Sequence, residues 1–172
     1  VTTGQWHHVA LAASSSGVIL YVDGEAAGAS GRSAISTASN PLRFGMTTNF
    51  GGAALNGRVD EVTFFNRALD PSEVASISDD SVTAICRPCA PLPTDALAWW
   101  QAEDDATDEI SGFDGTLDGD ASFVAGKVGN ALSFSGAGHV ALPKTAAWDF
   151  GTSSFSIVAW FASSSVGYRN II

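Results

Sequence analysis

The chain has 172 residues, enough to bury one sizeable hydrophobic core, and its 18 Gly, six Pro and scattered apolar residues are typical of an all-β protein with many turns. Its net charge of −10, from 18 acidic side chains against eight Lys and Arg, argues against nucleic acid as a partner, because phosphate-backbone binding relies on basic patches. No apolar run approaches the roughly 18 residues that a membrane span needs, so we expect no membrane span.

Short strands are predicted along the first half of the chain. Trp6–Ala13 and Val18–Val22 have the alternation and the β-branched or aromatic residues of strands, and Asp23–Gly24 supplies the positive-φ positions of a tight hairpin turn. Leu42–Met46 is a further short strand, and Val59–Phe65 is the most strand-like run.

A helix and a linker follow. Asp70 can cap a helix, Pro71 suits its first position and Glu73 lies three residues after the cap, so the sequence predicts a short helix to about Ile77. Beyond Cys86 the chain has three prolines within six residues, which prevents regular ladder bonding and predicts a domain boundary.

The predicted division is residues 1–80, a Cys- and Pro-rich linker over 81–96, and residues 97–172. Leu97–Ala102 and Ser154–Ala162 are predicted strands of the last part. Between them lies an acidic stretch with eight carboxylates: Glu103, Asp104, Asp105, Asp108, Glu109, Asp114, Asp118 and Asp120.

Two sets of short motifs stand out. The first part carries Gly4–Ala10, Leu20–Gly24, Gly57–Val62, Asn66–Leu69 and Ser72–Val74; the second carries Leu97–Trp100, Ala106–Asp108, Gly115–Leu117, Gly126–Leu132 and Phe155–Trp160. They resemble the carboxy-terminal and amino-terminal halves, respectively, of the concanavalin A-like, laminin-G-like jelly-roll modules of secreted bacterial multidomain proteins. The resemblance implies an antiparallel β-sandwich, and the reversed order of the halves implies a fragment of a tandem array.

Two arrangements of these halves follow. They belong to different neighbouring modules, or they pair with each other as a circularly permuted sandwich closed through the linker, whose roughly 15 residues can bridge tens of ångströms when extended. The permuted sandwich would lack several central strands, so we expect unpaired edges, exposed apolar faces and marginal stability.

The resemblance also implies a function. Such modules attach without catalysis to glycans or other extracellular surfaces, often with a structural calcium ion, although fold alone does not fix a ligand. Neighbouring modules of the same chain are further partners, and a purely structural or adhesion repeat is the alternative. A glycoside hydrolase is disfavoured, because the acidic stretch lacks the alternation that would project paired carboxylates from a strand into a cleft.

Calcium is the expected cofactor. The acidic stretch is either a solvated loop or a hard-cation site, since Ca²⁺ prefers several flexible oxygen ligands. The candidate ligands are Glu103, Asp108 and Asp60, whose strand ends converge if the halves pair.

The tryptophans are candidates for sugar stacking. Trp99 and Trp100 are adjacent, so they face opposite sides of a strand and only one of them is expected in the core. The other lies beneath a neighbouring loop or stacks on a sugar ring, and we take Trp100 and the loop residue Trp148 as the candidate ligand-binding residues.

Cys86 and Cys89 form a Cys-x-x-Cys motif. Zinc would need two more ligands, and a redox motif should open a helix rather than lie among prolines. A linker disulfide, between the two or to neighbouring segments, suits an oxidising exterior better. His7 and His8 are expected to be structural, because neighbouring strand positions point to opposite faces and no third ligand is evident.

Overall fold

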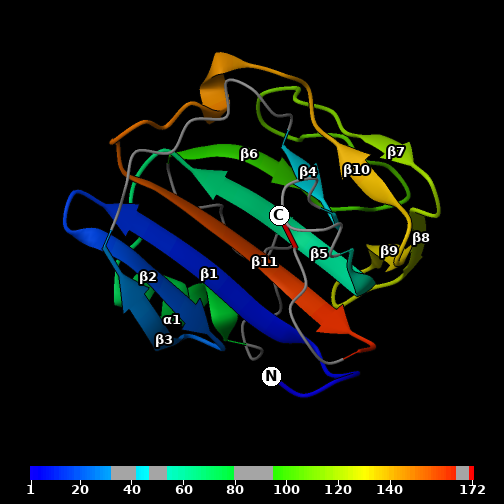
Figure 1. The fold of residues 1–172 in the computed structure, drawn as a ribbon, viewed down its shortest axis with the longest axis horizontal. Coiled ribbons are helices and arrows are strands. Elements are labelled where there is room, and N and C mark those ends of the chain that lie inside the picture. Colours follow the sequence, from blue (N-terminus) through cyan, green and yellow to red (C-terminus); the bar gives the residue numbers. More distant parts are fainter. Residues whose placement is uncertain (32–41, 47–53, 80–94, 166–170) are drawn as a thin grey trace.

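Two antiparallel sheets face each other in the computed structural model, which describes residues 1–31, 42–46, 54–79, 95–165 and 171–172 (Figure 1). The sandwich fold predicted from the sequence is confirmed. No helix in these described ranges has the length and apolar character to cross a membrane.

The larger sheet has eight strands in the order β3-β2-β1-β11-β5-β9-β8, with β6 also paired to β5. Their bounds are β1 His7–Ser14, β2 Gly17–Val22, β3 Glu25–Ser30, β5 Asn56–Phe65, β6 Ala96–Trp100, β8 Ser122–Ala125, β9 Asn130–Ser135 and β11 Phe155–Ser163. The smaller sheet has the order β4-β10-β7, with β4 Arg43–Phe44, β10 His139–Ala141 and β7 Thr116–Asp118. The described residues also form two helical elements, α1 Pro71–Ser78 and the 3₁₀ turn η1 Ala146–Trp148.

Strands from both halves of the chain interleave in the larger sheet. β11 lies between β1 and β5, with His7 to Ala13 paired to Phe161 to Phe155 on one side. On its other side it pairs with β5, which itself pairs with β6 and β9. Of the two arrangements left open by the sequence, the structure has the one in which the halves pair. The domain bounds stay a prediction, because residues 80–94, which include Cys86 and Cys89, lie outside the described residues.

Local sequence signals account for two connections. Asp23 and Gly24 adopt φ of 50° and 81°, so both positions of the predicted hairpin turn are left-handed. The Asp70 side chain accepts hydrogen bonds from the Ser72 and Glu73 N–H groups, and Glu73 reaches back to the Asp70 backbone. The predicted capping box of α1 is therefore confirmed.

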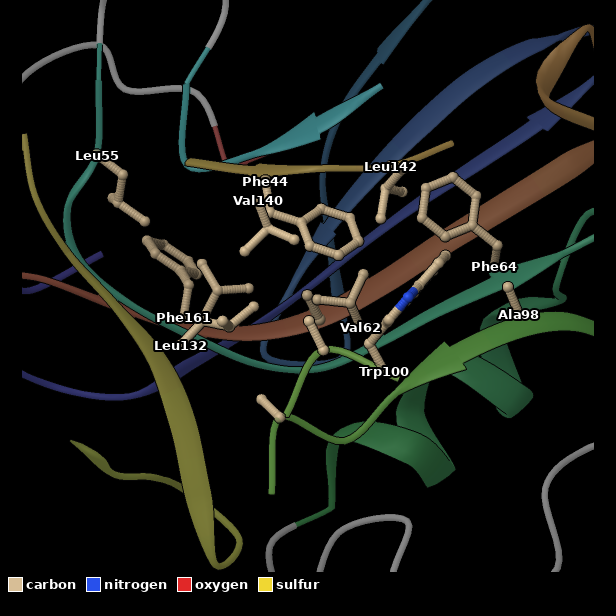
Figure 2. Close-up of a cluster of buried hydrophobic side chains, with 14 of the residues drawn as sticks. Phe44, Leu55, Val62, Phe64, Ala98, Trp100, Leu132, Val140, Leu142 and Phe161 are labelled. Carbon is tan, nitrogen blue, oxygen red and sulfur yellow. The ribbon is translucent and has the colours of Figure 1, made fainter. Parts of the chain in front are cut away.

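The core has two layers because both faces of the larger sheet are covered. The inner face, toward the smaller sheet, carries the main cluster, which includes Phe44, Val62, Phe64, Trp100, Leu132, Val140 and Phe161 (Figure 2). Trp148 also belongs to this cluster. The outer face carries a second cluster, which includes Ala10, Ala12, Tyr21, Phe65, Leu69, Val74 and Val158, with Val74 supplied by α1. The alternation of β1 follows this division, since Ala10 and Ala12 belong to the outer cluster and Val9 packs on the inner one.

Candidate functional site

An acidic β-bulge interrupts β5. Glu61 and Val62 together lie opposite the single residue Ala159 of β11, because the register of this strand pair shifts here. Glu61 has a φ of 53°, a left-handed conformation that is costly for a residue with a side chain. The extra residue breaks the alternation of the strand, so Val59 and Val62, three positions apart, both belong to the main core cluster. We call Asp60 and Glu61 the acidic bulge.

Both carboxyl groups of the acidic bulge are shut away from solvent. Asp60 is 0% exposed and Glu61 is 2% exposed. Asp60 Oδ2 accepts hydrogen bonds from the backbone N–H groups of Lys127, at 2.8 Å, and Val128, at 2.9 Å. Glu61 Oε2 accepts one from the Trp99 indole N–H at 2.6 Å. The second oxygen of each, Asp60 Oδ1 and Glu61 Oε1, is buried with no hydrogen-bond partner, an arrangement that disfavours a negative charge.

The proton affinity of the acidic bulge follows from this burial. Burial raises the pKa of Asp60 to about 7, and the negative charge of Glu103 adds to the rise while the backbone hydrogen bonds oppose it. Burial also raises the pKa of Glu61 to about 8; the Trp99 hydrogen bond opposes this rise, and the charges of Asp60 and Glu103 add to it. The two carboxyls repel each other when ionised, so they titrate as a coupled pair.

Asp108 plays a different part from the one expected. Its side chain is buried and accepts four backbone N–H groups, two on each oxygen: Trp99 at 2.8 Å and Ile110 at 3.1 Å on Oδ1, Ser111 at 3.1 Å and Phe113 at 3.0 Å on Oδ2. With both oxygens committed to the backbone, Asp108 ties the loop after β6 to the strand itself.

The structure brings together only part of the predicted cation site. Glu103 is exposed, accepts a hydrogen bond from the Asn130 N–H at 3.0 Å and interacts electrostatically with the acidic bulge, so Glu103 and Asp60 do converge. Within the described ranges, no group of three or more His, Cys, Asp or Glu side chains is placed so that it could hold a metal ion. The carboxyl group beside Asp60 is that of Glu61, which was not predicted from the sequence, and not that of Asp108.

The two tryptophans chosen for sugar stacking are buried. Trp100 and Trp148 are each 1% exposed, and their ring centroids lie 6.0 Å apart in the main core cluster. Trp99 is also 1% exposed, on the outer face beside Glu61. The expectation of an exposed face at Trp100 or Trp148 is therefore wrong, because both side chains pack inside the main core cluster. Of the adjacent pair, only Trp100 belongs to a core cluster, as expected, and Trp99 is buried outside both clusters.

An apolar groove remains on the inner face of the larger sheet. Its volume is about 830 Å³, and its lining includes Val9 and Leu11 of β1, Leu20 of β2 and Ile157 of β11, together with Ile171 and Ile172. None of its lining residues has a charged side chain. We refer to this feature as the apolar groove.

The comparison with protein families matched part of the chain. Residues 1–75 match the model described as the concanavalin A-like lectin/glucanases superfamily. Over these residues, which are less than half of the chain, the protein is similar to laminin-G-like modules of this superfamily. No curated protein and no solved structure matches it.

The matched segment ends within α1, but the larger sheet continues beyond it. β6, β8, β9 and β11 all lie beyond residue 75 and pair with one another or with strands of the matched segment. The acidic bulge lies inside the matched segment, whereas its hydrogen-bond donors Trp99, Lys127 and Val128 lie outside it. The site is thus assembled from both parts of the chain.

One exposed contact resembles the arrangement of a nucleophile, a general base and an acid in a catalytic triad. His7 Nδ1 lies 2.8 Å from Asp23 Oδ2, and His7 Nε2 lies 3.0 Å from Thr2 Oγ1. The backbone N–H of Thr2 also donates to His7 Nε2, at 2.9 Å. This bond occupies the lone pair that a general base would need, so the contact fixes the start of β1, and His7 is structural as expected.

His8 has a structural place as well. It is 1% exposed, packs edge-on against the Trp160 ring at a centroid distance of 5.3 Å, and neither of its ring nitrogens has a hydrogen-bond partner. Burial lowers the pKa of His8 to about 4, so the ring is neutral at pH 7.

Proposed function

We propose that this laminin-G-like module is a non-catalytic attachment module of an extracellular protein. The observation that carries the proposal is the apolar groove, whose size and uncharged lining suit a binding surface. Leu20, which lines it, is 44% exposed, so the groove is accessible at β2. Secretion is the setting in which modules resembling this one occur, and it forms part of the proposal.

The arrangement of the acidic groups supports the absence of catalysis. Glycoside hydrolysis requires two carboxyl groups that flank a substrate in a cleft. The buried carboxyls of the described residues are Asp60, Glu61 and Asp108, and each is at most 4% exposed. A sugar therefore has no access to the carboxyls whose environment would suit a general acid.

Glycans are the second proposed partner, after a protein surface. Stacking on a sugar needs an open aromatic face. Trp99, Trp100, Trp148 and Trp160 are at most 5% exposed, and Arg58 lies over the ring of the half-buried Trp6 at 5.0 Å. These observations favour attachment through apolar contacts, because none of the described tryptophans offers an open ring face on which a sugar could stack. They also make a purely structural repeat the runner-up.

Calcium enters the proposal at the acidic bulge. The unpartnered oxygens of Asp60 and Glu61, with Glu103 nearby, are the hard ligands that calcium prefers, whereas both Asp108 oxygens are taken. Binding would require Glu103 to leave its hydrogen bond with Asn130, since the present arrangement of the described side chains holds no ion-binding group of three. Calcium would neutralise the mutual repulsion of the carboxylates and pin the loop after β6 to β5.

A thermal melt with calcium and with excess chelator tests the structural ion. A cation that binds only the folded state raises the midpoint, by about 2.7 kcal/mol of added stability at a concentration of about 100 times Kd. We expect calcium to raise the midpoint of the parent chain and to raise that of Glu103→Gln less. Equal midpoints with calcium and chelator at pH 8 would remove calcium from the proposal.

The attachment function is tested on immobilised glycans and purified extracellular-matrix proteins, with product analysis of the glycans. We expect retention on a protein surface and no released sugar. Released sugar would refute the non-catalytic assignment, and failure to bind either class would leave the structural repeat. Leu20→Lys is the groove variant for this assay, and Ile19→Lys, on the opposite face of the same strand and 38% exposed, is its control.

A further inference from the structure

In the described part of the chain, one strand pairing holds one end of the larger sheet to the rest of it. β1, β2 and β3 lie side by side at this end, and of these three strands only β1 pairs outside the group, with β11 (Figure 1). The pairing runs from His7 to Ala13 of β1, opposite Phe161 to Phe155. We call β1, β2 and β3 the edge unit. Its attachment therefore depends on the β1–β11 ladder and on the side chains that pack along it.

His8 lies in this ladder with its ring buried. The ring is on the outer face, as are Ala10 and Ala12 of the same strand, is 1% exposed and packs edge-on against Trp160 of β11. Neither ring nitrogen has a hydrogen-bond partner among the described residues. The backbone holds the ring in place, since Asp23 donates its N–H to the His8 carbonyl at 2.8 Å and accepts the His8 N–H at 2.9 Å. The ring therefore cannot reach water while β1 stays paired with β11.

Asp23 is the charged group whose field reaches the His8 ring from the edge unit. Its negative charge favours a proton on the ring, but the carboxyl is exposed to solvent. It is also engaged already, since Oδ1 accepts the His8 backbone N–H and Oδ2 lies 2.8 Å from His7 Nδ1. Burial tends to raise the pKa of Asp23, but its hydrogen bonds to His7 and to the His8 N–H outweigh this and lower it from 3.8. The charge of Asp23 is thus present at pH 5 and above.

On the β11 side, the described groups around His8 are neutral, distant or positively charged. Trp160 is neutral and lies between His8 and Asp60, which is two strands away from His8 in β5. Lys127 Nζ lies 4.5 Å from the centroid of the Trp160 ring, and a cation there does not favour a second positive charge on His8. Desolvation of the ring outweighs the attraction of Asp23, so burial lowers the pKa of His8 from 6.5 to about 4.

We propose that His8 is an acid-sensitive switch, in which a proton on the buried ring releases the edge unit from β11. Release brings the ring into water, where an imidazolium is hydrated and needs no partner. The closed sheet is fully supported above pH 6.5, the pKa of the ring in water, and loses this support as pH falls toward 4, the pKa of the ring in the closed sheet. The ratio of open to closed molecules should therefore rise roughly 20-fold between pH 7 and pH 5.

The same opening would alter the apolar groove. Val9 and Leu20 line the groove from the edge unit, and Ile157 lines it from β11. Opening separates these two sides and would weaken binding at the groove as pH falls. This consequence rests on the proposed attachment function, whereas the switch itself does not. Because opening is measured without any ligand, a failure of attachment and a failure of the switch can be told apart.

Hydrogen–deuterium exchange of the whole chain at pH 7, 6 and 5 measures the opening. Dividing the intrinsic exchange rate at each pH by the observed rate gives a protection factor for each strand, which removes the direct effect of pH on exchange. We expect the protection factor of β1 to fall roughly 20-fold from pH 7 to pH 5. β9, which pairs with β5 and β8, should show no such fall.

Two histidine variants show whether the fall belongs to His8. His8→Phe keeps an aromatic ring against Trp160 but cannot take up a proton, so its β1 protection factor should be the same at pH 7 and pH 5. His139→Gln is the matched control, since it removes a half-buried histidine from β10 in the smaller sheet and should retain the fall seen in the parent. Constant protection of β1 in the parent, or equal falls in the parent and His8→Phe, would overturn the proposal.

The parent chain gives a second readout that does not depend on whether His8→Phe folds. Nuclear magnetic resonance follows the ring protons of His8, assigned through their contact with the Trp160 ring, as the pH is lowered. We expect a titration midpoint near 4. A midpoint near 6.5 would show that the buried ring accepts a proton without cost, and it would overturn the switch whatever the variant does.

Discussion

Replacing Glu61 with glutamine should change how the stability of the module depends on pH. The folded state holds the pKa of Glu61 at about 8, above its ordinary value of 4.5, because burial disfavours the charged form. The group therefore supports folding fully below pH 4.5, and this support is lost as pH rises toward 8. Over that window one such group lowers the free energy of unfolding by up to about 1.4 kcal/mol per pH unit.

The amide that replaces the carboxyl would keep an oxygen for the Trp99 indole N–H but cannot ionise. The free energy of unfolding of Glu61→Gln should therefore fall less steeply with pH, because the variant lacks this titrating group. At pH 8 the variant should be more stable than the parent by about 1–3 kcal/mol. At pH 5 the difference should shrink or reverse, because the buried carboxyl is protonated in the folded parent and the amide gains nothing over it. Asp60 keeps its own raised pKa, so some slope remains in the variant.

Urea unfolding followed by tryptophan fluorescence, at pH 5, 6, 7 and 8, measures the effect. Glu25→Gln is the matched control, since it removes the same charge from an exposed side chain of β3 and should leave the pH slope unchanged. Parallel stability profiles for the parent and Glu61→Gln would refute the argument, because they would mean that Glu61 titrates alike in the folded and unfolded chains.

Two further substitutions test the packing around the site. A Cβ at Gly57 would overlap the Ala162 carbonyl oxygen of β11, so Gly57→Ala should lower the free energy of unfolding in urea by about 1–3 kcal/mol. The control is Gly28→Ala in β3, where the space around the residue is open, and its stability should change by less than about 0.5 kcal/mol. Similar stabilities for the two alanine variants would contradict the pairing of β5 with β11. Asp108→Asn should cost about 1–3 kcal/mol because it turns an amide toward backbone N–H donors, and the exposed Asp105→Asn serves as control; equal losses would contradict the role of Asp108 in the loop.

The strands and the helix were largely predictable because their signals are local. Trp6–Ala13 overlaps β1, Val18–Val22 lies within β2, and the Asp70 cap marks the start of α1. In each of these segments, an alternation of apolar residues or a capping residue indicates the local structure independently of the rest of the chain. Pairing between strands far apart in the chain is set by which faces can be buried together, and sequence reasoning left it as two alternatives.

The site was less predictable, for two physical reasons. Strict alternation would place Asp60 and Glu61 on opposite faces of the strand. The bulge has no sequence signal, because its residue with positive φ is a glutamate and not a glycine. The expectation for Trp100 and Trp148 failed because exposure depends on what lies above a strand or loop. A buried glutamate bonded to an indole is recognisable only once β5 and β6 are placed side by side.

The pH slope predicted for Glu61 also tests whether the halves of the chain pair in solution. The groups that bond the acidic bulge all belong to the second half of the chain: Trp99 on β6, and Lys127 and Val128 in the turn between β8 and β9. The strand that forces the bulge, β11, also comes from that half. Separated from these elements, Asp60 and Glu61 would face water and would have no reason for a raised pKa. If the free energy of unfolding falls steeply between pH 5 and 8 and Glu61→Gln reduces this fall, the two halves of the chain must pair in solution. The pH dependence of stability therefore measures the pairing of the halves.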